Sequence, residues 1–337
     1  MDPLPAGLRT RIAPTPSGLL HSGNGASFLL TARLARLAGG TLLLRIDDLD
    51  AERVREPYLA DIFDTLHWLG ITWQEGPATV EEHRARYSQE LRLPRYRSLL
   101  DVLREQGSLY ACTCSRSTIA TCACRDAGHA FEGPDRSWRL RLPPQCPIEV
   151  PSWPGPPIVL DLVAALPDPV VRQRNGRPAY QIASLADDVD RGITFIVRGM
   201  DLLPSTACQL HLAKLLGLPV FQAVTFVHHP LLVDAKGEKL SKSHGATSLR
   251  AQREQGGSAA VVKAQADDLL ARLLGGGILA GRDRSLCPVT FWIKSSFSHI
   301  WRYHRTSTDH APPSRPFRFL VPPSRASPRE HSTGPFP

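Results

Sequence analysis

The sequence contains no hydrophobic stretch long enough to cross a membrane. Its apolar runs are broken by arginine before they reach the roughly 20 residues that a membrane helix needs. No apolar segment follows a basic start at the N-terminus, as it would in a secretory signal. We therefore expect a protein of the cytoplasm that has no membrane partner.

Cysteine is also scarce, and its distribution does not indicate a disulfide framework. The 337 residues include seven cysteines, an odd number, and four of these lie between Cys112 and Cys124. With 42% hydrophobic residues, the chain has the composition of an ordinary globular protein. It is long enough to bury a large core and to form about two domains.

The chain has fewer acidic than basic residues, but most of the excess positive charge lies near its C-terminus. The net charge of the chain is +8. Residues 275–337 hold eight Arg and one Lys against two Asp and one Glu, a net charge of +6, which leaves +2 for the first 274 residues. The basicity of the whole chain is therefore weak evidence for a nucleic-acid groove.

A turn rich in proline and glycine follows the first expected strand, residues 9–13. The sequence RIAPTPSGLLHSGN covers residues 11–24, and a helix is expected from there to about residue 38. A helix start presents unpaired N–H groups and a partial positive charge, which suit a phosphate group. Gly23 lets the backbone approach a ligand closely, and His21 can hydrogen-bond a phosphate oxygen.

A second polar segment lies about two hundred residues later. It is the loop KLSKS, in which Lys239 and Lys242 can neutralise charge that develops on a polyphosphate. Taken alone, such a loop is commonly an ordinary solvated surface. The histidine turn and the lysine loop in this order within an α/β chain are a far more specific signal.

Further strands are expected to end at polar residues. Residues 41–46 form a compact apolar run typical of a buried parallel strand, and an acidic cluster that begins with Asp47 follows it. Residues 180–185 and 192–197 are also predicted to be strands, the second ending at Arg198. A guanidinium that closes a buried strand needs an anion or several hydrogen-bond acceptors.

The His21 turn and the KLSKS loop resemble the HIGH and KMSKS signatures of class I aminoacyl-tRNA synthetases. The segments LRIDDLD (44–50) and RGMDLL (198–203) resemble the glutamate branch of that family, over roughly residues 9–250. The resemblance implies an α/β fold with a Rossmann-type (HUP-like), doubly wound parallel sheet. It also implies a small α+β subdomain that bears zinc, inserted into the sheet, and an irregular tail at the C-terminus.

The expected parts follow from the same resemblance. They are 1–106 (first half of the catalytic domain), 107–178 (inserted acceptor and zinc subdomain), 179–250 (second half, with the KLSKS loop), 251–274 (a C-terminal helix) and 275–337. This last segment has nine prolines in 63 residues and no helical or strand period, so we expect it to be disordered or non-native.

The resemblance also assigns roles to residues. His21, Lys242 and Lys239 would be catalytic, and ATP, with its Mg²⁺, would contact His21, Gly23, Asn24 and Lys242. The residues implied for glutamate are Arg11, Ile12, Ala13, Pro14, Thr15, Asp47, Tyr180 and Arg198. The chain departs from the family at Asp47, where the family has Glu, and at Ala207-Cys208, where it usually has Pro-Arg.

Two closely spaced cysteine pairs indicate a zinc site. Four thiolates, from Cys112, Cys114, Cys122 and Cys124, would complete a tetrahedral shell around one structural Zn²⁺. The spacing is CxC rather than CxxC, so unliganded thiols remain an alternative, and His129 is a reserve ligand. The resembling family has a Cys-x-Cys followed by a later Tyr and Cys; here Cys122 and Cys124 would replace that second pair.

The region after the lysine loop is short. About one helix is expected, at 261–274, whereas glutamyl-tRNA synthetases continue with helical domains that read the anticodon. The chain is similar to short members of the family that lack those domains and attach glutamate to the base queuosine of tRNA(Asp).

The expected function is therefore activation of glutamate by ATP to glutamyl-adenylate, followed by transfer to queuosine in tRNA(Asp), by a monomer. Three alternatives remain. They are a truncated or discriminating glutamyl-tRNA synthetase that charges a tRNA 3′ end, a non-catalytic tRNA-binding protein derived from a synthetase, and a nucleotidyltransferase of the same fold.

Overall fold

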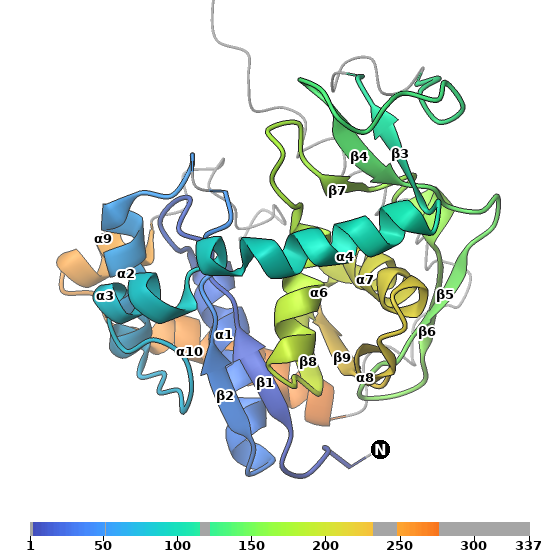
Figure 1. Ribbon diagram of the computed structural model, residues 1–337. Helices are drawn as coiled ribbons and strands as arrows, with labels where there is room; N and C mark the ends of the chain where they lie inside the picture. Colours follow the sequence, from blue (N-terminus) through green and yellow to red (C-terminus); the bar gives the residue numbers. More distant parts are fainter. Residues whose placement is uncertain (1–2, 51, 115–121, 232–247, 276–337) are drawn as a thin grey trace, which may run out of the picture. The chain divides into compact units, whose positions relative to one another are not determined.

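The computed structural model describes residues 3–50, 52–114, 122–231 and 248–275 of the chain (Figure 1). Its strands are β1 (Arg9–Ile12), β2 (Thr41–Leu44), β3 (Leu109–Cys112), β4 (Ser137–Leu140), β5 (Pro147–Val150), β6 (Ile158–Asp161), β7 (Val170–Arg172), β8 (Phe195–Gly199) and β9 (Thr225–His229). Its α-helices are α1 (Ser22–Leu37), α2 (Glu56–Leu69), α3 (Val80–Glu82), α4 (Leu93–Glu105), α5 (Leu162–Ala165), α6 (Tyr180–Asp190), α7 (Leu203–Leu215), α8 (Pro219–Gln222), α9 (Leu249–Glu254) and α10 (Ala260–Leu274). No helix in these ranges has the length and apolar character needed to span a membrane.

Two pairs of parallel strands carry the candidate site. β1 pairs with β2, so that Ile12 lies beside Leu44, and β8 pairs with β9, so that Gly199 lies beside His229. The two pairs adjoin at Arg9, whose carbonyl accepts a hydrogen bond from the Thr194 amide, N to O 2.9 Å. Parallel strands require crossover connections, and α1 supplies the one between β1 and β2. This arrangement confirms an α/β architecture.

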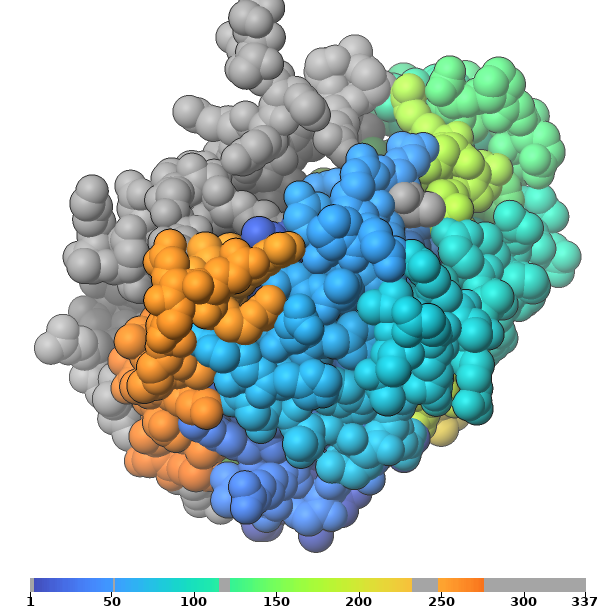
Figure 2. Space-filling view, turned by 90° about the vertical axis from the view of Figure 1, so that its left-hand side faces the viewer, coloured from blue at the N-terminus to red at the C-terminus, as the bar shows by residue number. Residues whose placement is uncertain are grey.

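The core forms where α1 covers the parallel strands. Leu30 and Leu34 of α1 are fully buried in the same cluster as Ile12 and Leu44. α9 and α10 pack on α1 and α2, and Figure 2 shows this orange segment lying directly against the blue surface. At Gly25 the helices approach so closely that a Cβ would lie 2.9 Å from the side chains of both Leu249 and Val262.

Antiparallel strands occupy the middle of the chain. β3, β4 and β7 form a three-stranded antiparallel sheet, and β5 and β6 form a separate antiparallel pair. The short helix α5 lies between β6 and β7. This mixture agrees with an α+β insertion between the two parallel pairs, although the boundaries expected at 107 and 178 stay a prediction.

The strand predicted for 180–185 is wrong, because these residues begin helix α6. A run of six residues has the length of a strand, but over the whole of α6 the apolar residues Ile182, Leu185 and Val189 recur at intervals of three and four, which is the helical period. The helix packs between α4 and α7.

Candidate active site

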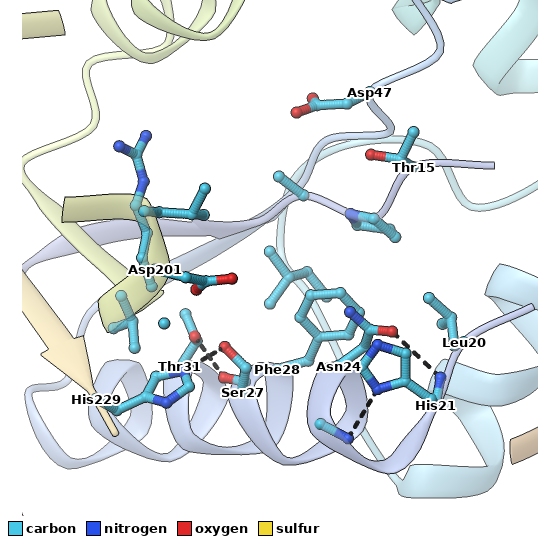
Figure 3. Close-up of a pocket in the computed structure, with 18 of the residues that line it drawn as sticks. Thr15, Leu20, His21, Asn24, Ser27, Phe28, Thr31, Asp47, Asp201 and His229 are labelled. Carbon is cyan, nitrogen blue, oxygen red and sulfur yellow. Dashed lines mark hydrogen bonds between the residues drawn. The ribbon is translucent and has the colours of Figure 1, made fainter. Parts of the chain in front are cut away.

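A cavity of about 500 Å³ opens where β1 and β8 end and α1 begins (Figure 3). Ligands of open α/β sheets commonly bind at this edge. The residues predicted for glutamate or ATP that line it are Arg11, Ile12, Ala13, Pro14, Thr15, His21, Gly23, Asn24, Asp47, Tyr180 and Arg198. Residues from both pairs of parallel strands thus share one cavity.

His21 is the N-cap of α1. Its Nδ1 accepts a hydrogen bond from the Gly23 amide at 3.1 Å, and its own amide donates to Oδ1 of Asn24 at 3.2 Å (Figure 3). This reciprocal capping holds the imidazole at the mouth of the cavity and determines where α1 begins. The first turn contains no acidic residue, so the partial positive charge of the helix start is not opposed there.

Three guanidinium groups converge on one carboxylate behind the cavity. Nε of Arg11 lies 2.9 Å from Oδ1 of Asp188, and Nη1 of Arg45 lies 2.7 Å from the same oxygen. Nη2 of Arg198 lies 3.7 Å from Oδ2. Burial by itself would raise the pKa of Asp188, but the three cations outweigh it and hold that pKa below its ordinary value, so the group is a carboxylate.

Arg198 is buried at the end of β8, with part of its hydrogen-bonding capacity unused. Its Nη1 donates to Oε1 of Gln209 at 2.7 Å and to Oγ1 of Thr206 at 3.1 Å. Nε and Nη2 have no hydrogen-bond partner among the described residues, although both are buried. Because the side chain lines the cavity, an anion placed there could satisfy these donors.

Asp47 approaches the cavity from the segment that follows β2. Arg45 holds it through Nε to Oδ1 at 2.6 Å and Nη2 to Oδ2 at 3.1 Å. Burial raises the pKa of Asp47, and this ion pair offsets part of the rise. Tyr180 lies across the cavity at the start of α6, with 37% of its surface exposed. It can therefore contact a ligand.

Lys239 and Lys242 fall in residues 232–247, outside the described part of the chain. Described residues before and after that segment lie close to the site. Leu231 lines the cavity, and the Leu249 amide donates to the carbonyl of Leu20, beside His21, at 2.9 Å.

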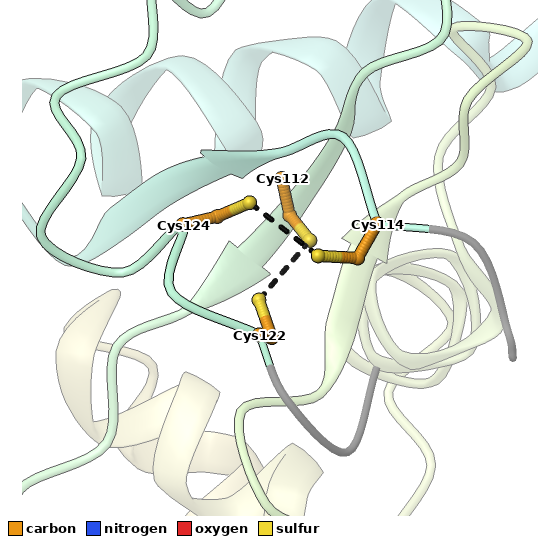
Figure 4. Close-up of side chains that lie close together, drawn as sticks. All are labelled: Cys112, Cys114, Cys122 and Cys124. Carbon is orange, nitrogen blue, oxygen red and sulfur yellow. Dashed lines mark hydrogen bonds between the residues drawn. The ribbon is translucent and has the colours of Figure 1, made fainter. Parts of the chain in front are cut away.

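The four cysteines predicted to bind zinc lie together at the end of β3 (Figure 4). Their Sγ atoms all lie within 4.8 Å of one another, with Cys112 3.6 Å from Cys122 and Cys114 3.6 Å from Cys124. Four sulfurs arranged tetrahedrally at the usual zinc–sulfur length would be about 3.8 Å apart. The cluster could therefore bind a zinc ion. His129 is exposed and is not among the grouped ligands.

Several residues of the cavity were not predicted from the sequence. They include Ser27, Phe28 and Thr31 of α1, together with Asp201 and His229 (Figure 3). The helical period of α1 could have indicated the first three, because they follow Asn24 on the same face at intervals of three or four residues. Ala207 and Cys208, the departure noted in the sequence, are fully buried in α7 and do not line the cavity.

Comparison with known proteins agrees with this geometry. The family model described as "tRNA synthetases class I (E and Q), catalytic domain" matches residues 7–140 and 158–262. A protein named glutamyl-Q tRNA(Asp) synthetase from Nitratidesulfovibrio vulgaris is 37% identical over 276 residues, covering 75% of this chain and 83% of its own. One named glutamate–tRNA ligase 2 from Acidithiobacillus ferrooxidans is 36% identical over 289 residues, 79% of this chain but 58% of its own.

Among solved structures, glutamate–tRNA synthetase from Elizabethkingia anophelis matches with a TM-score of 0.56 and 23% identity. The match covers 74% of this chain and 54% of that protein, so the chain spans about half the length of the structure, and the likeness concerns the fold alone. The family model, by contrast, accounts for most of the chain and for both walls of the cavity. The chain therefore belongs to the family of class I tRNA synthetase catalytic domains for glutamate and glutamine.

Proposed function

We propose that this protein activates glutamate with ATP and transfers the glutamyl group to the queuosine base of tRNA(Asp). In the first step an α-carboxylate oxygen of glutamate attacks the α-phosphorus of ATP. The bond to pyrophosphate breaks, and glutamyl-adenylate forms. No protein base is required, because the nucleophile is already an anion at neutral pH. The protein contributes positioning and stabilisation of charge on the phosphate oxygens.

The nucleotide would bind at the start of α1. His21, Gly23 and Asn24 would lie against its phosphates, with Mg²⁺ accompanying ATP. Lys242, assisted by Lys239, would neutralise the β- and γ-phosphates as pyrophosphate leaves. The positions of Leu231 and Leu249 support this role, because Leu231 lines the cavity and the Leu249 amide donates to the carbonyl of the cavity residue Leu20.

Glutamate would bind on the other side of the cavity, against Arg11, Arg198 and Tyr180, and along residues 12–15. Asp47 would face its α-amino group. The observation that supports the proposal best is the buried Arg198, whose Nε and Nη2 lack hydrogen-bond partners among the described residues. A substrate carboxylate would satisfy both donors, whereas the amide of glutamine would bring N–H groups toward them.

Replacement of Arg198 tests the glutamate site. We expect Arg198→Ala to reduce glutamate-dependent exchange between ATP and pyrophosphate by at least a hundredfold, because truncating a buried, hydrogen-bonded cation commonly costs several kcal/mol of binding. Arg191→Ala, at the end of α6 and away from the cavity lining, is the control and should retain exchange. Exchange by Arg198→Ala at the wild-type rate would remove Arg198 from the glutamate site.

The transfer step is supported by the relatives that the chain resembles. Proteins named glutamyl-Q tRNA(Asp) synthetase from Nitratidesulfovibrio vulgaris and Rhodobacter capsulatus are 37% and 34% identical to it, each over 75% of its length. The test is incubation with labelled glutamate, ATP and purified tRNA(Asp), with and without queuosine. We expect label only on the tRNA that contains queuosine, including tRNA whose 3′-terminal adenosine has been removed.

Two outcomes would favour the alternatives. Label on purified tRNA(Glu) that is lost with the 3′-terminal adenosine, with none on either tRNA(Asp) preparation, would identify a glutamyl-tRNA synthetase. Binding of tRNA without any labelling would identify a non-catalytic protein derived from a synthetase. Periodate cannot replace these controls, because it destroys the diol of queuosine as well as the 3′ diol.

The proposal also covers the sheet, the inserted subdomain and its zinc site. The two parallel strand pairs would act as one doubly wound sheet of the HUP type, with residues 107–178 inserted as the acceptor subdomain. One structural Zn²⁺ held by Cys112, Cys114, Cys122 and Cys124 would stabilise that subdomain.

A further inference from the structure

Asp188 lies behind the wall of the cavity rather than on it. It belongs to α6, two turns after Tyr180, and its side chain is completely buried. It is not among the residues that line the cavity. Two of the arginines that it contacts, Arg11 and Arg198, do line the cavity, and the third, Arg45, holds the cavity residue Asp47. Asp188 therefore touches each cationic component of the proposed glutamate site.

The two carboxylate oxygens of Asp188 contact different arginines. Oδ1 accepts from Nε of Arg11 at 2.9 Å and from Nη1 of Arg45 at 2.7 Å. Oδ2 has no hydrogen-bond donor among the described residues, but faces Nη2 of Arg198 at 3.7 Å. Without this carboxylate, three buried guanidiniums would repel one another at close range, where low polarity strengthens the repulsion.

The charges of the cluster do not balance. Arg11, Arg45 and Arg198 supply three positive charges, and Asp188 and Asp47 supply two negative charges, which leaves one positive charge in excess. An uncompensated buried charge is costly, so the cluster favours the entry of one anionic group. A substrate carboxylate at Arg198 would provide it.

We propose that Asp188 is a positioning residue for glutamate, holding Arg11 and Arg198 in their cavity-facing arrangement and, through Arg45, setting the place of Asp47. This inference rests on the proposed function. Arg198 is held on its other side by Gln209 and Thr206, so that Asp188 and these two residues together determine where its remaining donors point.

The test is Asp188→Asn, assayed by ATP–pyrophosphate exchange. The amide oxygen can still accept from Arg11 and Arg45, but the amide nitrogen would face Nη2 of Arg198, donor against donor, and the negative charge is lost. We expect the KM for glutamate to rise at least tenfold while the KM for ATP changes less than twofold. A general loss of folded protein would lower the rate without separating the two KM values.

The matched control is Asp187→Asn, at the neighbouring position. Asp187 is buried too, but it accepts from Nε of Arg92 at 2.5 Å and from the Tyr96 hydroxyl at 2.8 Å, away from the cavity lining. We expect this variant to lose stability and to keep both KM values within twofold of the wild type. Such a result would separate the role of Asp188 from that of any buried aspartate in α6.

The possible results separate a failure of the proposed function from a failure of the role inferred for Asp188. Absence of glutamate-dependent exchange in the wild-type chain would overturn the proposed function and this inference with it. Exchange in the wild type, combined with an unchanged glutamate KM or an equal rise in both KM values in Asp188→Asn, would overturn the inference alone.

If Asp188→Asn does not fold, the same two KM values are measured in Arg45→Gln, because glutamine cannot join Asp188 to Asp47. The same separation of KM values is expected, and its absence contradicts the proposal.

Discussion

Arg198 belongs to a layer of buried polar side chains that lies between the cavity and α7. Oγ1 of Thr206 accepts from Arg198 and also lies 2.9 Å from Nε2 of His228. The His228 ring stacks on Phe226, with ring centres 6.0 Å apart and 20° between the planes. Burial, reinforced by the charge of Arg198 and by His229, lowers the pKa of His228 to about 3. This histidine is therefore neutral at physiological pH.

A neutral buried histidine makes stability depend on pH in a defined direction. Below the ordinary pKa of about 6.5 the unfolded chain binds a proton that the folded chain does not bind, so the folded state loses stability as pH falls toward about 3. The slope from one such histidine is about 1.4 kcal/mol per pH unit.

We expect His228→Gln to remove most of this slope. Glutamine at position 228 does not titrate, although its amide can still reach Thr206. Urea unfolding of both proteins between pH 4 and 6.5 would measure the difference. Parallel curves of unfolding free energy against pH would contradict a neutral His228.

At the scale of elements, the cysteine cluster is built at the end of strand β3. Cys112 is the last residue of the strand, opposite Ser137 of β4, and Cys114 lies two residues after it. The backbone pairing fixes one thiol, and the nearby chain brings Cys122 and Cys124 within reach of it. A metal held by this cluster would join the two segments that enter and leave residues 115–121.

We expect the purified protein to contain about one zinc per chain, and Cys114→Ser to lose it, because a tetrahedral structural site needs all four of its thiolates. Elemental mass spectrometry of the dialysed proteins measures the content. Cys146→Ser is the control, since it removes a buried cysteine elsewhere, beside His211, and should keep the zinc. Equal zinc content in both variants would argue against the cluster as the site.

At the scale of the whole molecule, residues near the end of the described chain stabilise its beginning. Arg253 of α9 donates to Oγ1 of Thr65 at 3.0 Å and to Oδ1 of Asp61 at 3.1 Å, both in α2. Val262, Ala266 and Leu269 of α10 belong to the same buried core cluster as α1. The helix that begins at His21 therefore depends on segments more than two hundred residues away.

Two truncated chains measure how much α10 and the residues after it contribute to stability. We expect a chain that ends at Gly275 to retain ATP–pyrophosphate exchange and its unfolding temperature, because the sequence predicts that residues 275–337 are disordered or non-native. A chain that ends at Gly257 lacks α10 and should lose several kcal/mol of stability, since each buried aliphatic side chain contributes roughly 1.5–3 kcal/mol. Thermal unfolding measures both. Equal unfolding temperatures for the two truncated chains would contradict the role of α10.

Local signals in the sequence determined the parts of the site that lie close together in the chain. Proline, glycine and a capping histidine specify the turn between β1 and α1, and the run after Thr41 specifies β2. The same kind of signal separates α4 from the residues before it, since Pro94 stands in its first turn. The cysteine pairs likewise predicted their own cluster.

Tertiary structure alone decided the network that α6 carries. Residues 180–185 by themselves are too short to distinguish a helix from a strand, whereas α6 as a whole shows the helical period in Ile182, Leu185 and Val189. Asp188 meets Arg11 across 177 positions and Arg45 across 143. Such pairings depend on how distant elements pack, and no local periodicity encodes them, because the stabilising charge interaction exists only after the core has brought the elements together.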